Sequence, residues 1–91
     1  MGTCEVKARK GLIRVSVTVS QGIITSARIT GDFIVVPEDA VLDMEERLVN
    51  VRASRDDVSK VVNEAIRGAS LIGCSEQDFV DAILCAAGEA A

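Results

Sequence analysis

The sequence predicts an α+β fold in which a three-stranded antiparallel β-meander is followed by three helices packed on one face of the sheet. Composition changes at Pro37, the one proline: all four threonines precede it, and nine of the eleven alanines follow it. Charge changes at the same place. Residues 1–36 carry a net +3 from five basic and two acidic residues, and residues 37–91 carry −7 from five basic and twelve acidic residues. A strand-rich segment followed by a helix-rich segment is typical of an α+β layer fold. A chain of 91 residues is long enough for one domain, so we expect residues 1–91 to form a single domain.

The strand half is recognised by its alternation of apolar and polar side chains. Residues 4–8 alternate and then turn back near Lys10-Gly11. Residues 13–19 alternate more strongly, and residues 23–30 follow as a third strand. These three strands predict a sheet with one apolar face.

The turn between the second and third strands sets their register. A two-residue loop would pair Val19 with Ile24 and then bring polar side chains onto the apolar face. We therefore expect a three-residue loop, residues 20–22, which pairs Val19 with Ile23. Gly22 then takes the left-handed position that a bulged hairpin needs. On the same register Val17 pairs with Thr25, Val15 with Ala27 and Ile13 with Ile29.

Three helix starts are marked by local chemistry. Pro37 suits the first position of a helix, and acidic residues directly after it complement the helix dipole. Ser54 with Asp57, and Ser75 with Asp78, have the spacing of capping boxes. The apolar stripes expected to face the sheet are Ala40, Val41, Met44 and Leu48; Val58, Val61, Val62, Ala65 and Ile66; and Phe79, Ala82, Ile83 and Ala86.

The composition argues against a self-contained active site. The chain has no His, Trp or Tyr and only two Phe. It therefore lacks histidine, the commonest general base in catalysis, and nearly all of the aromatic rings on which nucleic-acid-binding proteins stack nucleobases. No nucleotide-binding, hydrolase or metalloprotease motif is present. The pairs Glu45-Glu46 and Asp56-Asp57 are adjacent on helices, so their carboxylates diverge by about 100°. We expect no catalytic residue and no metal site.

The three cysteines, Cys4, Cys74 and Cys85, are widely separated. An odd number is typical of a reducing compartment, and a zinc site would need a fourth ligand that no histidine can supply. No apolar run approaches the roughly 20 residues of a membrane span, and the N-terminus has no apolar signal segment. We expect packed or incidental thiols in a cytoplasmic protein.

Four basic residues are predicted together on the outer face of the sheet: Lys7, Arg9, Arg14 and Arg28. Leu12 and Ile24 are predicted on the same face. A solvated face explains the charges, and a patch for phosphate, nucleic acid or an acidic partner is the alternative.

Two other functions stay open on this basis. One is a regulatory or dimerisation module that self-associates through Leu12 and Ile24. The other, less favoured, is nucleic-acid binding through the basic face, because the chain is acidic overall and no aromatic side chains interleave with the basic ones.

The most distinctive segment is the strand-to-helix connector, residues 29–39. Gly31-Asp32 has turn chemistry, and four large apolar residues, 33–36, follow it. One interpretation is a tight link that buries Phe33 against the helices. The other is that some of these side chains are exposed and bind a partner, because four are more than such a link needs.

Several motifs follow one another in a characteristic order: Lys10-Gly11-Leu12-Ile13-Arg14-Val15, Gln21-Gly22-Ile23-Ile24, Ile29-Thr30-Gly31-Asp32-Phe33, Pro37-Glu38-Asp39 and Glu45-Glu46. In this order they resemble the small C-terminal domain of lipoate–protein ligases. The similarity is greatest to the archaeal form, in which this domain is a separate small protein beside the catalytic subunit. It is strongest over residues 6–48 and looser over the later helices, where the start at residues 75–79 carries it. Ile34 stands where the family often has a second aromatic residue, and Leu12 where it often has a second glycine.

The resemblance implies an accessory subunit of a two-component ligase. Such a ligase joins lipoate to AMP using ATP and Mg²⁺, and then passes the lipoyl group to a lysine of an acceptor domain. In this family the pocket and the catalytic lysine belong to the large subunit, and the small domain is similar to a lid that adenylation requires. This agrees with a chain that carries no catalytic set of its own.

The same resemblance implies partners and contact residues. We expect no activity and no bound cofactor for the chain alone, and lipoate, ATP and Mg²⁺ in its complex with the catalytic subunit. We expect a heterodimer with that subunit, lipoyl acceptor domains reached through the complex, and neither membrane nor nucleic acid as a partner. The candidate partner contacts are Gly31, Asp32 and Phe33, with Lys10 and Gly11 second.

Overall fold

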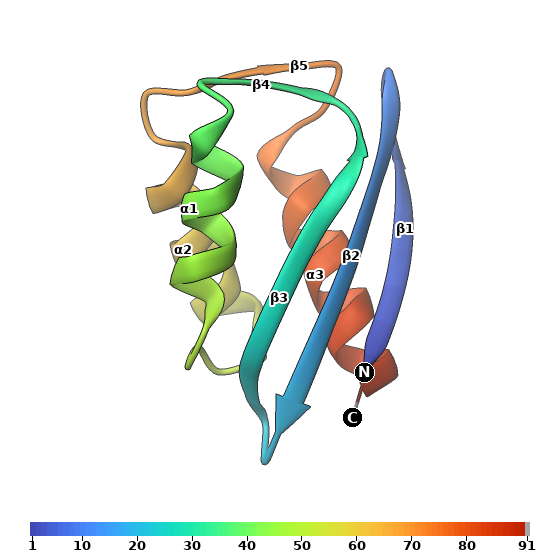
Figure 1. Ribbon diagram of the computed structural model, residues 1–91, viewed down its shortest axis with the longest axis vertical. Coiled ribbons are helices and arrows are strands. Elements are labelled where there is room, and N and C mark those ends of the chain that lie inside the picture. The colour runs from blue at the N-terminus through green and yellow to red at the C-terminus, as the bar shows by residue number, and fades with distance from the viewer. Residues whose placement is uncertain (91) are drawn as a thin grey trace.

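In the computed structural model, which describes residues 1–90, two helices pack on one face of a three-stranded antiparallel sheet, and a further helix packs on those two (Figure 1). The sheet has the order β1-β2-β3, with β1 at Gly2–Ala8, β2 at Gly11–Ser20 and β3 at Ile23–Asp32. The helices are α1 (Asp39–Leu48), α2 (Arg55–Ile66) and α3 (Glu76–Ala90). Two short strands, β4 (Ile34–Val36) and β5 (Ser70–Ile72), form a second sheet. The predicted α+β class, meander and three helices are confirmed.

The core lies between the three-stranded sheet and the helices. Helix α3 packs on β1 and β2, α1 packs on β3, and α2 packs on both other helices. The inward side chains of β2, Ile13, Val15 and Val17, are buried against this layer. The predicted stripe of α3 is completely buried: Phe79, Ala82, Ile83 and Ala86.

The predicted register between β2 and β3 is wrong. Gln21 and Gly22 form a two-residue loop with φ values of 52° and 78°, and Val19 pairs with Ile24. Positive φ at both central residues is the requirement of the hairpin turn that matches strand twist. The polar mismatch expected from this loop is removed by a β-bulge, because Thr25 is an extra residue between the Val19–Ile24 and Thr18–Ser26 pairs.

The bulge changes which side chains face the core. Beyond it Val17 pairs with Ala27, Val15 with Ile29 and Ile13 with Gly31. Ile24 precedes the bulge and is completely buried, so the prediction that it lies on the outer face is wrong. Apolar pairing is thus restored by one inserted residue instead of by a longer loop.

Two of the three predicted helix starts are confirmed. The Ser54 side chain accepts a hydrogen bond from the Asp57 N–H. Before α3, the Asp78 N–H donates to Ser75 Oγ at 3.2 Å, and the Ser75 N–H donates to an Asp78 carboxylate oxygen at 2.9 Å. The third start is wrong by two residues, since α1 begins at Asp39 and not at Pro37. Residue 37 follows β4 directly, and its carbonyl accepts from the Ala40 N–H in a single turn before regular helix begins.

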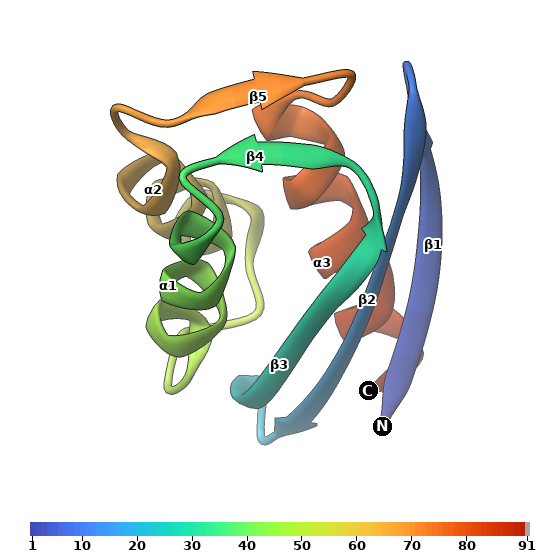
Figure 2. The same cartoon turned by 45° about the horizontal axis from the view of Figure 1, so that its top comes forward.

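The second sheet was not predicted. Strand β4 belongs to the apolar connector, and β5 to the link between α2 and α3; Ile34 pairs with Ile72 and Val35 with Leu71. Figure 2 shows the two strands lying across one end of the helical layer. Val35 points inward and is buried, so β4 alternates as a strand does. Each strand has only three residues, too few for a period to be recognised in the sequence.

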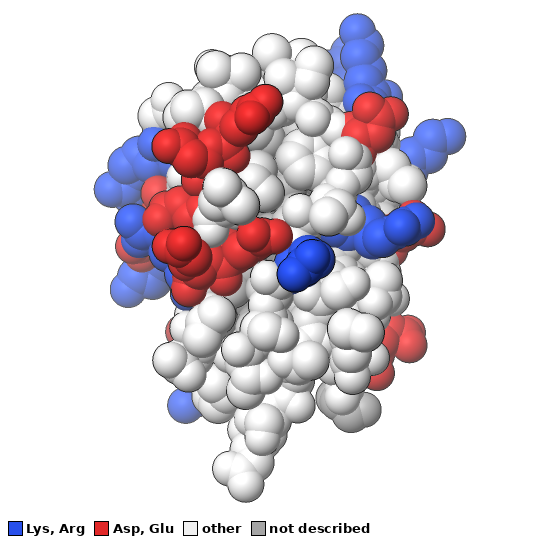
Figure 3. Space-filling model, in the orientation of Figure 1, with Lys and Arg blue, Asp and Glu red and all other residues white. Residues whose placement is uncertain are grey.

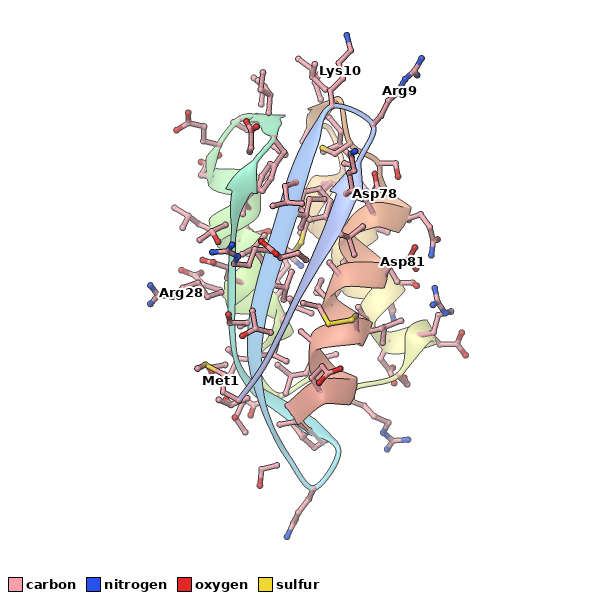
Figure 4. The ribbon with its side chains drawn as sticks, turned by 90° about the vertical axis from the view of Figure 1, so that its right-hand side faces the viewer. Met1, Arg9, Lys10, Arg28, Asp78 and Asp81 are labelled. Atoms are coloured by element: carbon pink, nitrogen blue, oxygen red, sulfur yellow. A yellow bond between two sulfur atoms is a disulfide. The ribbon has the colours of Figure 1, made fainter. Side chains whose placement is uncertain are left out.

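The cysteines also differ from the prediction. Cys4 of β1 and Cys85 of α3 are joined by a disulfide (Figure 4), so two of the three expected thiols are paired. The pairing depends on β1 lying along α3, which sequence spacing does not reveal. Cys74 is unpaired, and partial burial, together with the negative charge of Asp78, raises its pKa. Among residues 1–90, no helix has both the length and the apolar character needed to cross a membrane.

Candidate partner interface

The five predicted contact residues lie at one end of the sheet, although they come from separate segments. Lys10 is in the turn between β1 and β2, and its N–H donates to the Gly73 carbonyl at 2.8 Å, just after β5. Gly11 opens β2, while Gly31 and Asp32 close β3, where Asp32 pairs with Leu12. Figure 4 shows Lys10 at the tip of this end. The fold therefore brings the candidates together beside β4 and β5.

Gly11 and Gly31 have a role inside the fold. Their φ values are 148° and 144°, a region that favours glycine. A Cβ on Gly11 would lie 1.7 Å from the Asp32 carbonyl oxygen, and a Cβ on Gly31 would lie 2.1 Å from the Leu12 carbonyl oxygen. The close approach of β2 and β3 at this end requires both glycines.

Phe33 is half-buried and belongs to the core boundary. Its ring meets that of Phe79 edge-on, with centroids 5.3 Å apart and an interplanar angle of 86°. Such a pair is worth about 0.5–1.5 kcal/mol beyond area burial. The interpretation of a link that packs Phe33 onto the helices is supported, and any contact of its exposed edge with a partner stays a prediction.

Large apolar side chains are nevertheless exposed beside Phe33. Ile34 is 54% exposed, Val36 54% and Ile72 51%, and Leu42 of α1 is 60% exposed. Ile34 and Ile72 are direct neighbours across the β4–β5 pair. We call these four residues the β4–β5 patch. Residues 34 and 36 of the connector are thus available to a partner, as the second interpretation expected.

A groove of about 440 Å³ makes the patch continuous with α1. Its lining includes Phe33, Ile34 and Val36 of the connector, Leu42 of α1, and Glu38 at the start of α1. The lining is mostly apolar, with one carboxylate. A shallow apolar groove of this kind suits a side chain of another protein.

The surface around α1 is acidic. Glu38, Asp39 and Glu46 are exposed on this helix or at its start, and Figure 3 shows acidic side chains gathered over α1. Asp43 is engaged by Arg47, whose Nε donates to a carboxylate oxygen at 2.6 Å and whose pKa this contact raises. Glu45 accepts from the Ile29 N–H at 2.6 Å and so occupies part of the β3 edge.

The outer face of the sheet is less basic than predicted. Arg14 is paired with Glu5 across β1 and β2, with Nε 2.9 Å from a carboxylate oxygen. Lys7 and Arg28 lie on this face, whereas Arg9 lies in the turn, because β1 ends at Ala8. Mixed charge of this kind suits a solvated face better than a nucleic-acid surface.

The self-association surface through Leu12 and Ile24 is contradicted, since only Leu12 is accessible there. No cluster of three or more metal-ligating side chains occurs among residues 1–90. The chemically distinctive surface of the described chain is therefore the apolar and acidic one around β4, β5 and α1.

Comparison with known proteins agrees with this architecture. The family model described as the C-terminus of bacterial lipoate protein ligase matches residues 3–83. Lipoate-protein ligase A subunit 2 of Thermoplasma acidophilum is 33% identical over 82 residues, which cover 85% of this chain and 81% of that protein. A solved structure from the same organism, of a bi-partite lipoate protein ligase and its E2 lipoyl domain, matches with a TM-score of 0.82. That match has 28% identity and covers 89% of this chain and 91% of the other. The chain belongs to the lipoate–protein ligase C-terminal domain family.

Proposed function

We propose that this chain is the accessory subunit of a two-component lipoate–protein ligase. With a catalytic subunit it would support ATP-dependent formation of lipoyl-AMP and transfer of the lipoyl group to a lysine of an acceptor domain. The observation that carries the proposal is the match, over most of both chains, to a protein that is itself a second ligase subunit. The exposed apolar patch supports it, since a domain that acts by contact with another protein needs such a surface.

The role we propose is closure over a site that the partner provides. No catalytic residue is assigned to this chain, and lipoate, ATP and Mg²⁺ are assigned to the complex. A mixed anhydride such as lipoyl-AMP hydrolyses if water reaches it, so a domain that covers the site protects the intermediate and holds the reactants in position. A small, compactly packed domain can move as a rigid body in that role. Its cytoplasmic location stays a prediction.

Lipoate-dependent exchange between ATP and radioactive pyrophosphate tests the proposal, because it measures adenylation without the transfer step. We expect no exchange with this chain alone and at least about tenfold faster exchange when it is added to the catalytic subunit. Transfer to a lipoyl acceptor domain, followed by mass spectrometry, should show the same dependence.

The matched control is an equal concentration of this chain after heat denaturation, which leaves composition unchanged and removes the folded surface. A catalytic subunit that exchanges pyrophosphate at the same rate with and without the folded chain would overturn the proposal.

A further inference from the structure

The β4–β5 patch brings four exposed apolar side chains together on one surface. Its residues come from β4, β5 and α1, yet they are continuous, since Ile34 and Ile72 are cross-strand neighbours and Ile34 shares the groove with Leu42. Isolated exposed apolar side chains are ordinary, whereas several that share one groove mark a surface that another molecule covers.

The charge around the patch limits which kind of molecule can bind there. On α1 and at its N-cap, residues three or four positions from Leu42 share its side of the helix, and these are all acidic: Glu38, Asp39, Glu45 and Glu46. Glu38 also lines the groove. Within residues 1–90, no cation lies within ion-pair distance of Glu38, Asp39 or Glu46. The charges of Glu38 and Glu46 are therefore available to an approaching surface, whereas Asp39 lines a neighbouring hollow together with Arg67.

The opposite border has mixed charge. Lys10 lies beside Gly73, at the end of β5, and Asp32 lies beside Leu12. The two charges at this border are of opposite sign, so the acidic side of α1 decides the character of the rim.

An acidic rim disfavours two of the possible occupants. A second copy of this chain, docked by two-fold symmetry, would place the carboxylates of one α1 near those of the other, and like charges in contact cost several kcal/mol. An anionic membrane surface would be repelled for the same reason. A protein surface bordered by Lys or Arg side chains would be attracted.

We propose that the β4–β5 patch is the surface by which this chain binds the catalytic ligase subunit, and that the matching surface there is apolar with a basic border. The assignment rests on the proposed function. It names an interface distinct from the backbone-constrained positions Gly11 and Gly31, whose glycines the fold itself requires.

The apolar part of the interface is tested with Ile34→Asp, Ile72→Asp and the double variant. Binding to the purified catalytic subunit is measured by isothermal titration calorimetry. We expect the double variant to raise Kd at least about 30-fold, because buried apolar anchors dominate interface affinity. Leu42→Asp, on α1, changes the patch from a different element and should raise Kd about tenfold.

Val49→Asp is the matched control for these changes. Val49 is an exposed apolar residue at the far end of α1, outside the patch, and we expect its variant to keep Kd within about twofold. Circular dichroism melting of each variant shows whether it is folded; since the substituted side chains are exposed, we expect all of them to fold.

The charged part is tested with Glu38→Lys. We expect slower association and a Kd raised about three- to tenfold at low salt, with the difference shrinking as salt is added. Glu89→Lys makes the same change on exposed α3 surface away from the patch and should have little effect.

The outcomes separate the two proposals. If the wild-type chain does not bind the catalytic subunit, the proposed function and this assignment both fail. If wild type binds and the folded patch variants bind equally well, the assignment alone is overturned. A wild-type homodimer that Ile34→Asp dissociates would also overturn it, because the patch would then be covered by a second copy.

Discussion

The two sheets of this protein obey the same alternation but present opposite surfaces to solvent. In the three-stranded sheet the inward positions are apolar and mostly buried or half-buried, and the outward ones are mostly polar, as in the Thr18–Ser26 and Arg14–Thr30 pairs. In the two-stranded sheet the inward position Val35 is buried as well, but the outward positions include Ile34, Val36 and Ile72. One sheet has a face suited to water, and the other has a face suited to contact.

This difference between the sheets assigns them different roles, one in stabilising the fold and the other in contact with another molecule. Burial of the inner face of β1–β3 against α1 and α3 supplies apolar contact that holds the chain together. The outward side of β4 and β5 contributes little to that burial, so apolar residues there are not explained by folding. Substitutions in the two sheets should accordingly affect different measurements.

The disulfide should have the largest effect on stability. It ties β1, the edge of the larger sheet, to α3 across 81 residues of sequence. We expect Cys4→Ser to lower the free energy of unfolding by about 4 kcal/mol, because the crosslink restricts the unfolded chain. Urea denaturation measures this, and Cys74→Ser serves as a control that should stay within about 1 kcal/mol.

Reduction of the wild-type protein should reproduce the Cys4→Ser value, since Cys85 is exposed and the disulfide is accessible to dithiothreitol. Equal stability of the oxidised and reduced proteins would contradict the stabilising role of this crosslink.

The same substitution in each sheet tests the comparison directly. Ile13→Ala removes a completely buried side chain of β2 and should lower the free energy of unfolding by about 3 kcal/mol. Ile34→Ala removes an exposed side chain of β4 and should cost less than about 1 kcal/mol. Both values come from urea denaturation. Comparable losses at the two positions would mean that the two sheets contribute alike to folding.

Phe33 lies between the two regions and should show an intermediate effect. We expect Phe33→Ala to destabilise the chain by about 2 kcal/mol, because the ring is half-buried and packs edge-on against Phe79. Phe33→Leu retains apolar contact and should cost about 1 kcal/mol. Thermal melts compare the two variants. If the Phe33→Ala chain is as stable as wild type but fails to activate the catalytic subunit, Phe33 acts in the interface and not in the core.

Cys74 should show the smallest effect. Partial burial and Asp78 raise the pKa of its thiol, so less thiolate is present at pH 8 than in an ordinary cysteine. We expect alkylation by iodoacetamide to be about 2–10 times slower in the folded protein than in urea. The rate should rise with pH in both states.

Under non-reducing conditions one thiol per chain should react, and three after reduction. Three reactive thiols before reduction would show that Cys4 and Cys85 are not joined.

Sequence reasoning located the candidate interface only in part. It identified the connector as too apolar for a simple link, and residues 34 and 36 are indeed exposed. It did not identify Ile72 or Leu42, because each is an ordinary apolar residue in its own segment and becomes part of a surface only when β5 pairs with β4 and α1 packs beside them. The sequence contained one indication for Leu42, which is its place as an apolar residue on the otherwise acidic side of α1.

Local chemistry was enough to establish the class, the order of the strands, most of the buried stripe residues of the helices and two of the three helix starts. These features depend on residues within a few positions of one another, where alternation and capping act. The bulge at Thr25, the β4–β5 pair and the Cys4–Cys85 bond were settled only by the folded chain. Each depends on segments that meet because the core brings them together, and neither strand periodicity nor cysteine spacing encodes such a meeting. The candidate interface belongs to this second group, since its apolar residues share a surface only after the helices and both sheets have packed.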